Sequence, residues 1–231
     1  MTRALLAIGA TLLGVACGGG SSPTLATPVP TPSPAAPTAR YSVTFEAQWR
    51  AETHPTDIPS DPHFSRLIGG THSARVRFWA PGAIASDGVE RMAEEGRTSP
   101  LDLEIMAAIS AAHAQHLIRG ESIPLSPAST SVEFEISLEH PLVTLVSMVA
   151  PSPDWFVGVH DLSLVENGDW VREKVVMLYP YDAGSDSGVT FTSPDRDTQP
   201  REPIHSIETP PLALSGMVAP MGTFTFRRLG S

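Results

Sequence analysis

One stretch, residues 151–188, constrains the fold of this chain more than any other. It contains two apolar runs, Trp155–Leu164 and Val171–Tyr179, and each run has about the length of one β-strand. If the two runs pair, they form a simple antiparallel hairpin, and the outer ends of its strands lie side by side. We therefore expect polar groups at those outer ends to share one location.

Three aspartates occupy these outer ends: Asp154 precedes the first run, and Asp182 and Asp186 follow the second. Three converging carboxylates repel one another unless a cation lies between them, and hard oxygen ligands suit Ca²⁺ best. Gly184 and Gly188 allow the second segment to bend, so that its two aspartates can face one point. These residue types suggest a calcium site whose shell is completed by backbone carbonyls and water.

The same residues also fit an interpretation without a metal. Asp154 follows a proline and can cap a turn, and DAGSDSG can be a turn in which Asp side chains bond to nearby amides. An EF-hand is excluded, because position twelve of a loop that starts at Asp182 is Ser193 instead of Glu. The residues alone leave the calcium site and the metal-free turn as alternatives.

The N-terminus has the pattern of an export signal. Arg3 gives a short positive start, Ala4–Ala16 is apolar and too short to span a bilayer, and small residues precede Cys17. This resembles a bacterial lipobox, although Gly14 stands where Leu is preferred. We expect residues 1–17 to be a lipoprotein signal peptide and Cys17 to be the lipidated residue, on the bacterial outer membrane or cell surface. The alternative is ordinary cleavage and a free secreted protein.

Residues 18–40 are rich in Gly, Ser, Thr and Pro and have too few bulky apolar residues to fold, so we expect a disordered tether. Residues 41–231 then form one folded domain. The formal net charge is −10 and no cluster of Lys and Arg occurs, so nucleic acid is not an expected partner. Because Cys17 is the single cysteine, the domain must be stabilised by core packing, a metal, or both.

The domain reads as an all-β, antiparallel β-sandwich of about eight strands with two short accessory helices. Apolar residues alternate or run continuously in the further predicted strands: Tyr41–Trp49, Ser73–Trp79, Thr130–Leu138, Leu142–Val149, Val189–Thr192 and Thr223–Arg228. Leu142–Val149 is almost continuously apolar, which is typical of a central strand.

Two helices are predicted between these strands. The first starts at Ser86 and ends at Gly96, and the second has Ser99 as N-cap and Pro100 at its first position. One face of the second helix is apolar and should cover an end or edge of the sandwich: Leu101, Ile105, Ala108, Ile109 and Ala112. His113 and His116 would lie three apart on a helix, but no third metal ligand is evident.

Catalytic motifs give no support for an enzyme. The sequence has no His-Glu-x-x-His motif and no phosphate-binding glycine loop, and G-S-D-S-G has Asp where a nucleophile elbow has Ser. We therefore expect a binding module. The four tryptophans are expected in the core or at its rim instead of in a sugar-stacking platform: Trp49, Trp79, Trp155 and Trp170.

Several stretches, taken in order, resemble the spondin domain: YSVTFEAQW, HFSRLIGGTHS, SDGVERMAEEG, PSPDWFVGV, YPYDAGSDSG and FTFRRL. The resemblance extends from Tyr41 to about Leu229. It implies a C2-like antiparallel β-sandwich that binds one Ca²⁺ through Asp154, Asp182 and Asp186. Members of the family are extracellular matrix and cell-adhesion proteins.

The chain departs from that family because it lacks disulfide cysteines and begins like a bacterial lipoprotein, so the family's animal partners are not carried over. We expect a surface-anchored calcium-binding module for adhesion or extracellular recognition of an unidentified protein or glycan. One alternative is a calcium-dependent carbohydrate-binding module, which an exposed Trp155 would favour. Another is a structural envelope lipoprotein without a soluble ligand.

Overall fold

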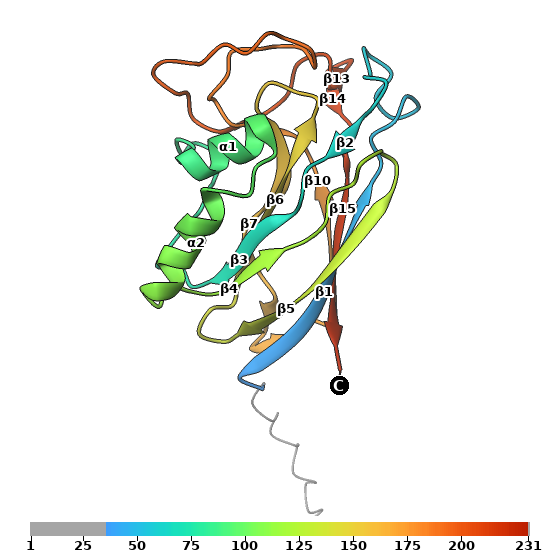
Figure 1. Cartoon of the computed structure of the whole chain (residues 1–231). Coiled ribbons are helices and arrows are strands. Elements are labelled where there is room, and N and C mark those ends of the chain that lie inside the picture. Colours follow the sequence, from blue (N-terminus) through green and yellow to red (C-terminus); the bar gives the residue numbers. More distant parts are fainter. Residues whose placement is uncertain (1–35, 231) are drawn as a thin grey trace, which may run out of the picture. The chain divides into compact units, whose positions relative to one another are not determined.

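The computed structural model describes residues 36–230. Two antiparallel sheets face each other, and two helices cover the outer face of one of them (Figure 1). Eight of the strands have five or more residues, and the described chain contains two α-helices. The predicted all-β antiparallel sandwich of about eight strands with two accessory helices is therefore confirmed.

The smaller sheet has four strands, in the order β10 (Glu173–Leu178), β15 (Gly222–Leu229), β1 (Thr38–Ala47) and β5 (Ser129–Ser137). The larger sheet has the order β12 (His205–Ser206), β11 (Tyr181–Asp182), β7 (Trp155–Ser163), β6 (Leu142–Ala150), β3 (Ile68–His72) and β4 (Ala114–Arg119), and β2 (His63–Phe64) pairs with β6. Two short hairpins complete the strands: β8 (Val165–Glu166) with β9 (Asp169–Trp170), and β13 (Ala213–Leu214) with β14 (Met217–Val218).

The core lies between the sheets and follows the predicted alternation. Every second residue of β1 from Tyr41 to Ala47 is buried, as is Trp49 beyond the strand. Phe45 packs edge-on against Phe64 and Phe224, with ring centroids 4.9 and 5.2 Å away. Such aromatic packing adds stabilisation beyond the burial of apolar area. β6 is central and buried along almost its whole length, as predicted.

The helices form a second apolar layer on the outer face of the larger sheet. In α1 (Asp87–Glu95), the Ser86 hydroxyl accepts a hydrogen bond from Val89 N at 3.2 Å, and Gly96 ends the helix with a φ of +66°, as predicted. Met92 of α1 and Ile105 of α2 (Leu101–Ser110) belong to this apolar layer. The helices therefore cover a face of the sandwich, whereas an end or an edge was expected.

Details of the second helix differ from the prediction. Pro100 is the N-cap and makes no side-chain bond, so Ser99 is not the cap. Ala112 lies beyond the helix and is exposed, while Leu101, Ile105 and Ala108 are buried as expected.

The two histidines expected on a helix lie elsewhere. His113 lies in a turn and His116 on β4, because the helix ends at Ser110. The prediction that they lie three apart on a helix was wrong.

Two predicted strands are absent from the described residues. The strand expected at Ser73–Trp79 is replaced by β3, which lies earlier in the chain at Ile68–His72. Gly69 allows β3 to approach β6 closely, because a Cβ on residue 69 would lie 2.0 Å from Thr144 O. Val189–Thr192 is a turn, in which the Ser193 hydroxyl accepts hydrogen bonds from two backbone amides. Both segments have apolar alternation but no partner strand.

The expected hairpin between the two apolar runs of residues 151–188 was wrong, because β7 and β10 belong to different sheets. β10 pairs with β15, while β7 lies between β6 and β11. The chain passes from one sheet to the other through the small β8–β9 hairpin. Local alternation predicts a strand, but it does not encode the sheet that the strand joins.

The domain begins slightly earlier than expected, because β1 starts at Thr38 and includes the last residues assigned to the tether. The predicted signal peptide, Cys17 and most of the tether lie outside the described residues. Within residues 36–230, no helix is long and apolar enough to cross a membrane.

Candidate metal centre at the aspartate loop

The three predicted aspartates lie at one end of the sandwich although the expected hairpin does not exist. β11 pairs with β7 and places Asp182 opposite Trp155. Because Trp155 follows Asp154 in the sequence, Asp182 lies close to Asp154. Asp186 lies in the loop of residues 183–204, which connects β11 to β12 and which we call the aspartate loop. This loop covers the end of the sandwich that lies away from the start of β1 (Figure 1).

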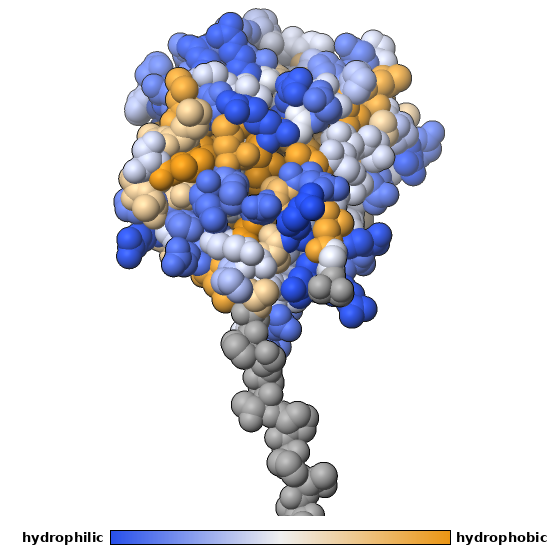
Figure 2. Space-filling model, turned by 60° about the horizontal axis from the view of Figure 1, so that its bottom comes forward, coloured by the Kyte–Doolittle hydropathy of each residue, from blue (hydrophilic) through white to orange (hydrophobic). Residues whose placement is uncertain are grey.

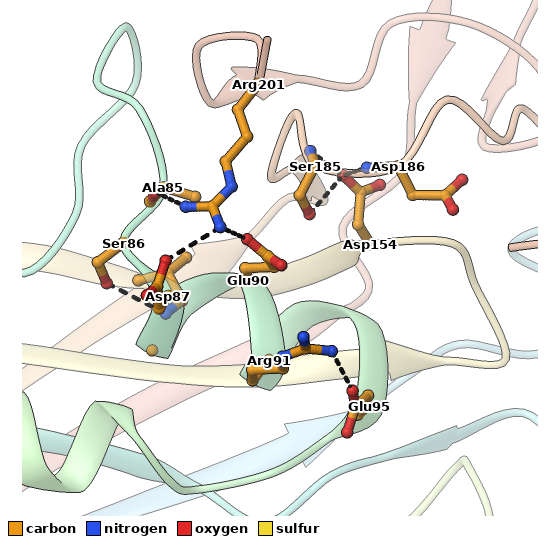
Figure 3. Close-up of polar contacts among 12 residues, drawn as sticks. Ala85, Ser86, Asp87, Glu90, Arg91, Glu95, Asp154, Ser185, Asp186 and Arg201 are labelled. Carbon is orange, nitrogen blue, oxygen red and sulfur yellow. Dashed lines mark hydrogen bonds and ion pairs between the residues drawn. The ribbon is translucent and has the colours of Figure 1, made fainter. Parts of the chain in front are cut away.

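Asp154 is completely buried, with 0% of its surface exposed. Its Oδ2 accepts hydrogen bonds from Ser185 N at 2.8 Å, Ser185 Oγ at 3.3 Å and Asp186 N at 3.0 Å (Figure 3). Its Oδ1 has no hydrogen-bond partner. Burial, together with the negative charge of Asp182, raises the pKa of Asp154 to about 7. A buried carboxylate with one free oxygen is costly unless a proton or a cation compensates it.

Asp182 and Asp186 each form a turn with their own backbone. Gly184 N donates to Asp182 Oδ1 at 2.8 Å, and Gly188 N donates to Asp186 Oδ1 at 2.6 Å. The bend at Gly184 needs glycine, because its φ is +73° and a Cβ would lie 2.1 Å from Glu202 O. The Asp-based turn considered from the sequence is therefore present. Gly184 bends the chain as expected, whereas Gly188 closes the Asp186 turn without a positive φ.

The two residues differ in how freely they face Asp154. Burial raises the pKa of Asp182, and its negative charge raises the pKa of Asp154 more than that of Asp186 does. Asp186 uses its second oxygen to accept from Arg196 N, and its carboxylate extends away from that of Asp154 (Figure 3). Asp154 and Asp182 are thus the better placed pair for a shared cation.

The fit of these residues to a metal ion is incomplete as they stand. Among residues 36–230, no three His, Cys, Asp or Glu side chains gather closely enough to hold a metal. Two observations nevertheless suit a hard cation: the free, buried Oδ1 of Asp154 and the all-oxygen donor set. Each carboxylate oxygen has two lone pairs, so an oxygen that accepts one amide can still bind a cation.

A pocket of about 540 Å³ is lined by Asp182 and Asp186, whereas Asp154 does not line it. Its charged lining residues are mostly acidic, with one histidine: Asp182, Asp186, Glu202, His205 and Glu208. No Lys or Arg lines this pocket, so its potential favours a positive ion.

All four tryptophans are buried, as predicted. Trp155, beside the pocket, is only 3% exposed, which counts against a sugar-stacking platform.

Sequence reasoning missed two residues that support the site. Ser185 provides two of the three hydrogen bonds to Asp154, and its position inside DAGSDSG was the available signal. Arg201 connects the aspartate loop to α1 through Ala85 O, Asp87 and Glu90, and no local sequence pattern indicates this role.

Comparison with known proteins identifies the family of this chain. The Spondin_N family matches residues 39–213. Spondin-2 of Rattus norvegicus is 36% identical over 201 residues, which cover 85% of this chain and 59% of the relative. Spondin-1 of Bos taurus is 38% identical over 185 residues, which cover 75% of this chain and 23% of the relative. The chain therefore spans only part of these relatives, and it is a member of the spondin N-terminal domain family.

Proposed function

We propose that this protein is an exported, surface-anchored recognition module of the spondin family that binds Ca²⁺ at the aspartate loop. Membership in the family supports extracellular adhesion or recognition. The observation that carries the calcium assignment is Asp154, a fully buried carboxylate with one oxygen that lacks any hydrogen-bond partner. A bound cation compensates that charge and offsets the repulsion from Asp182.

Asp154, Asp182 and Asp186 would hold the ion, and backbone carbonyls and water would complete its shell. When bound, the ion would supply positive charge beside the acidic pocket. The chain's own residues do the rest: the amides of Ser185 and Asp186 orient Asp154, and the turns at Gly184 and Gly188 orient the other two carboxylates.

Anchoring through a lipidated Cys17 gives the module its orientation. The chain enters the domain at the start of β1, and the aspartate loop lies at the other end of the sandwich (Figure 1). A module tethered through its N-terminus would thus present this loop away from the membrane. An extracellular protein fits this end better than a stacked sugar, because Trp155 is buried. We propose no catalytic role.

Calorimetric titration of Ca²⁺ into EDTA-treated protein tests the metal assignment. We expect one-to-one binding in the wild type and its loss in Asp182→Ala, while Glu133→Gln, which removes an exposed acid on β5, binds normally. Absence of heat in the wild type would show that the aspartates only form turns.

Mass spectrometry of the membrane fraction tests the anchor. We expect acyl chains on Cys17 and release of Cys17→Ala into the medium. Wild-type protein that is cleaved without acylation would establish the free secreted alternative.

A further inference from the structure

The aspartate loop folds back on itself as two antiparallel arms. The outgoing arm, residues 184–188, contains the amides that hold Asp154, and the returning arm, residues 196–202, runs alongside it. Three backbone hydrogen bonds of 2.8 to 3.0 Å join the arms: Thr198 N to Ser185 O, Glu202 N to Gly184 O, and Ser187 N to Arg196 O. Displacement of the returning arm would therefore move the amides that orient Asp154.

Arg201 attaches the returning arm to α1. Its guanidinium donates to Ala85 O at 3.2 Å and to Asp87 Oδ1 at 3.0 Å, and it pairs with Glu90 (Figure 3). The Arg201 side chain is 29% exposed and that of Glu90 14%. A partly buried guanidinium with three acceptors is a more specific contact than an exposed ion pair.

The charges around this contact explain why the positive charge of Arg201 stabilises it. Asp87, Glu90 and Glu94 lie on α1, and the carboxylate of Glu94 contacts the Ser185 side chain of the outgoing arm. The aspartate loop brings its own acids to the same region, so α1 and the loop would repel each other without Arg201. Burial raises the pKa of Glu94, and the negative charges of Glu90 and Asp195 raise it further.

We propose that Arg201 is a positioning residue of the metal centre: it holds the returning arm on α1 and thereby fixes the Ser185 and Asp186 amides around Asp154. This inference rests on the proposed calcium function for its effect on affinity. Its effect on the loop itself does not depend on the metal.

The test compares Arg201→Met with Arg91→Met in the full chain. Arg91 also lies on α1 but pairs with Glu95 on the same helix at 2.5 Å (Figure 3). Both substitutions remove one positive charge near the loop, and removal of a positive charge by itself strengthens the binding of a cation. If Arg201 positions the loop, Arg201→Met should instead weaken calcium binding, and Arg91→Met should not. We expect its calcium affinity to fall about tenfold, as for other outer-shell changes.

A second measurement, hydrogen exchange in EDTA, reads the position of the loop without metal. The Ser185 and Asp186 amides should exchange about tenfold faster in Arg201→Met than in the wild type or Arg91→Met, if the arm is released as proposed. Should Arg201→Met fail to fold, Arg201→Lys takes its place, because lysine keeps the charge but not the planar fork.

The outcomes separate the two proposals. Faster exchange together with weaker calcium binding supports both. Faster exchange without calcium binding in the wild type supports the role of Arg201 and overturns the calcium function. Normal calcium binding in the wild type, with affinity and exchange in Arg201→Met equal to those of Arg91→Met, overturns the role of Arg201.

Discussion

The apolar core between the two sheets and the aspartate loop are held together by different interactions. In the core, side chains such as Phe45 and Phe224 are fully buried and contact one another through aromatic rings. Beneath the aspartate loop, Asp154 is just as deeply buried, but its contacts are backbone amides and a hydroxyl from the loop. The same degree of burial is thus stabilising in one region and unfavourable in the other.

This difference separates the stability of the fold from the integrity of the site. Burial of apolar area does not depend on protonation or on a metal ion, so the core should be insensitive to both. The loop places acids next to one another, and its stability should therefore change with pH and Ca²⁺.

The surface adds a further contrast. Hydrophobic residues gather in one part of the face seen in Figure 2, and hydrophilic residues surround them. The exposed large hydrophobic residues include Leu103 and Met106 of α2. Apolar atoms make up a large share of any folded protein's surface, so this exposure by itself marks no binding site.

A core substitution should give the largest effect. Phe45→Ala removes a ring that contacts Phe64 and Phe224, and the expected loss is about 3 to 5 kcal/mol in the free energy of unfolding. The loss should be the same with EDTA and with Ca²⁺, which urea unfolding can measure. A loss that depends on calcium would break the separation between core and loop.

The pH dependence of the calcium-free protein should come next. Asp154 has a pKa of about 7 in the folded state and 3.8 as its ordinary value, so the folded state binds more protons between these pH values. The free energy of unfolding should therefore fall as the pH rises from about 4 to about 7, by about 4 kcal/mol at most.

Urea unfolding in EDTA at several pH values, for wild type and Asp154→Asn, measures this contribution. The variant cannot titrate at this position, so the difference between the two proteins isolates Asp154 from other titrating groups. Parallel pH profiles would show that Asp154 carries no shifted proton.

Calcium should restore part of the free energy of unfolding that the calcium-free protein loses at neutral pH. A metal that binds only the folded state stabilises it by about 2.7 kcal/mol at a hundredfold excess over Kd. The gain should be large at pH 8 and small at pH 5, because protons compete for Asp154. Thermal unfolding with and without Ca²⁺ measures it, and an equal gain in Asp182→Asn would contradict the assignment.

The smallest expected effect comes from a substitution in the helical layer. Ser86→Ala removes the hydroxyl that caps Val89 N and donates to Glu104 at 2.7 Å, with an expected loss of about 1 kcal/mol. Thermal unfolding should show this loss, and calcium affinity should stay within twofold of the wild type. A larger change in affinity would mean that α1 as a whole, and not Arg201 in particular, positions the loop.

Elements whose signal is local could be predicted from the sequence. Alternation in β1 and β5, the continuous apolar run of β6, and the start of α1 at Ser86 and its end at Gly96 all appear where expected. Strand identity failed where a segment such as Ser73–Trp79 alternates but finds no partner. Alternation shows that a segment has one apolar face. That face becomes buried in a sheet only if another part of the chain supplies a partner strand and a surface to pack against.

The sequence by itself determined that Asp154, Asp182 and Asp186 flank apolar strands and that glycines bend the chain between them, since both depend on neighbouring residues. Only the tertiary structure decided that β7 and β10 separate into two sheets and that β11 returns to β7. It also decided that Arg201 reaches α1, because a contact across the fold depends on packing that no local pattern contains.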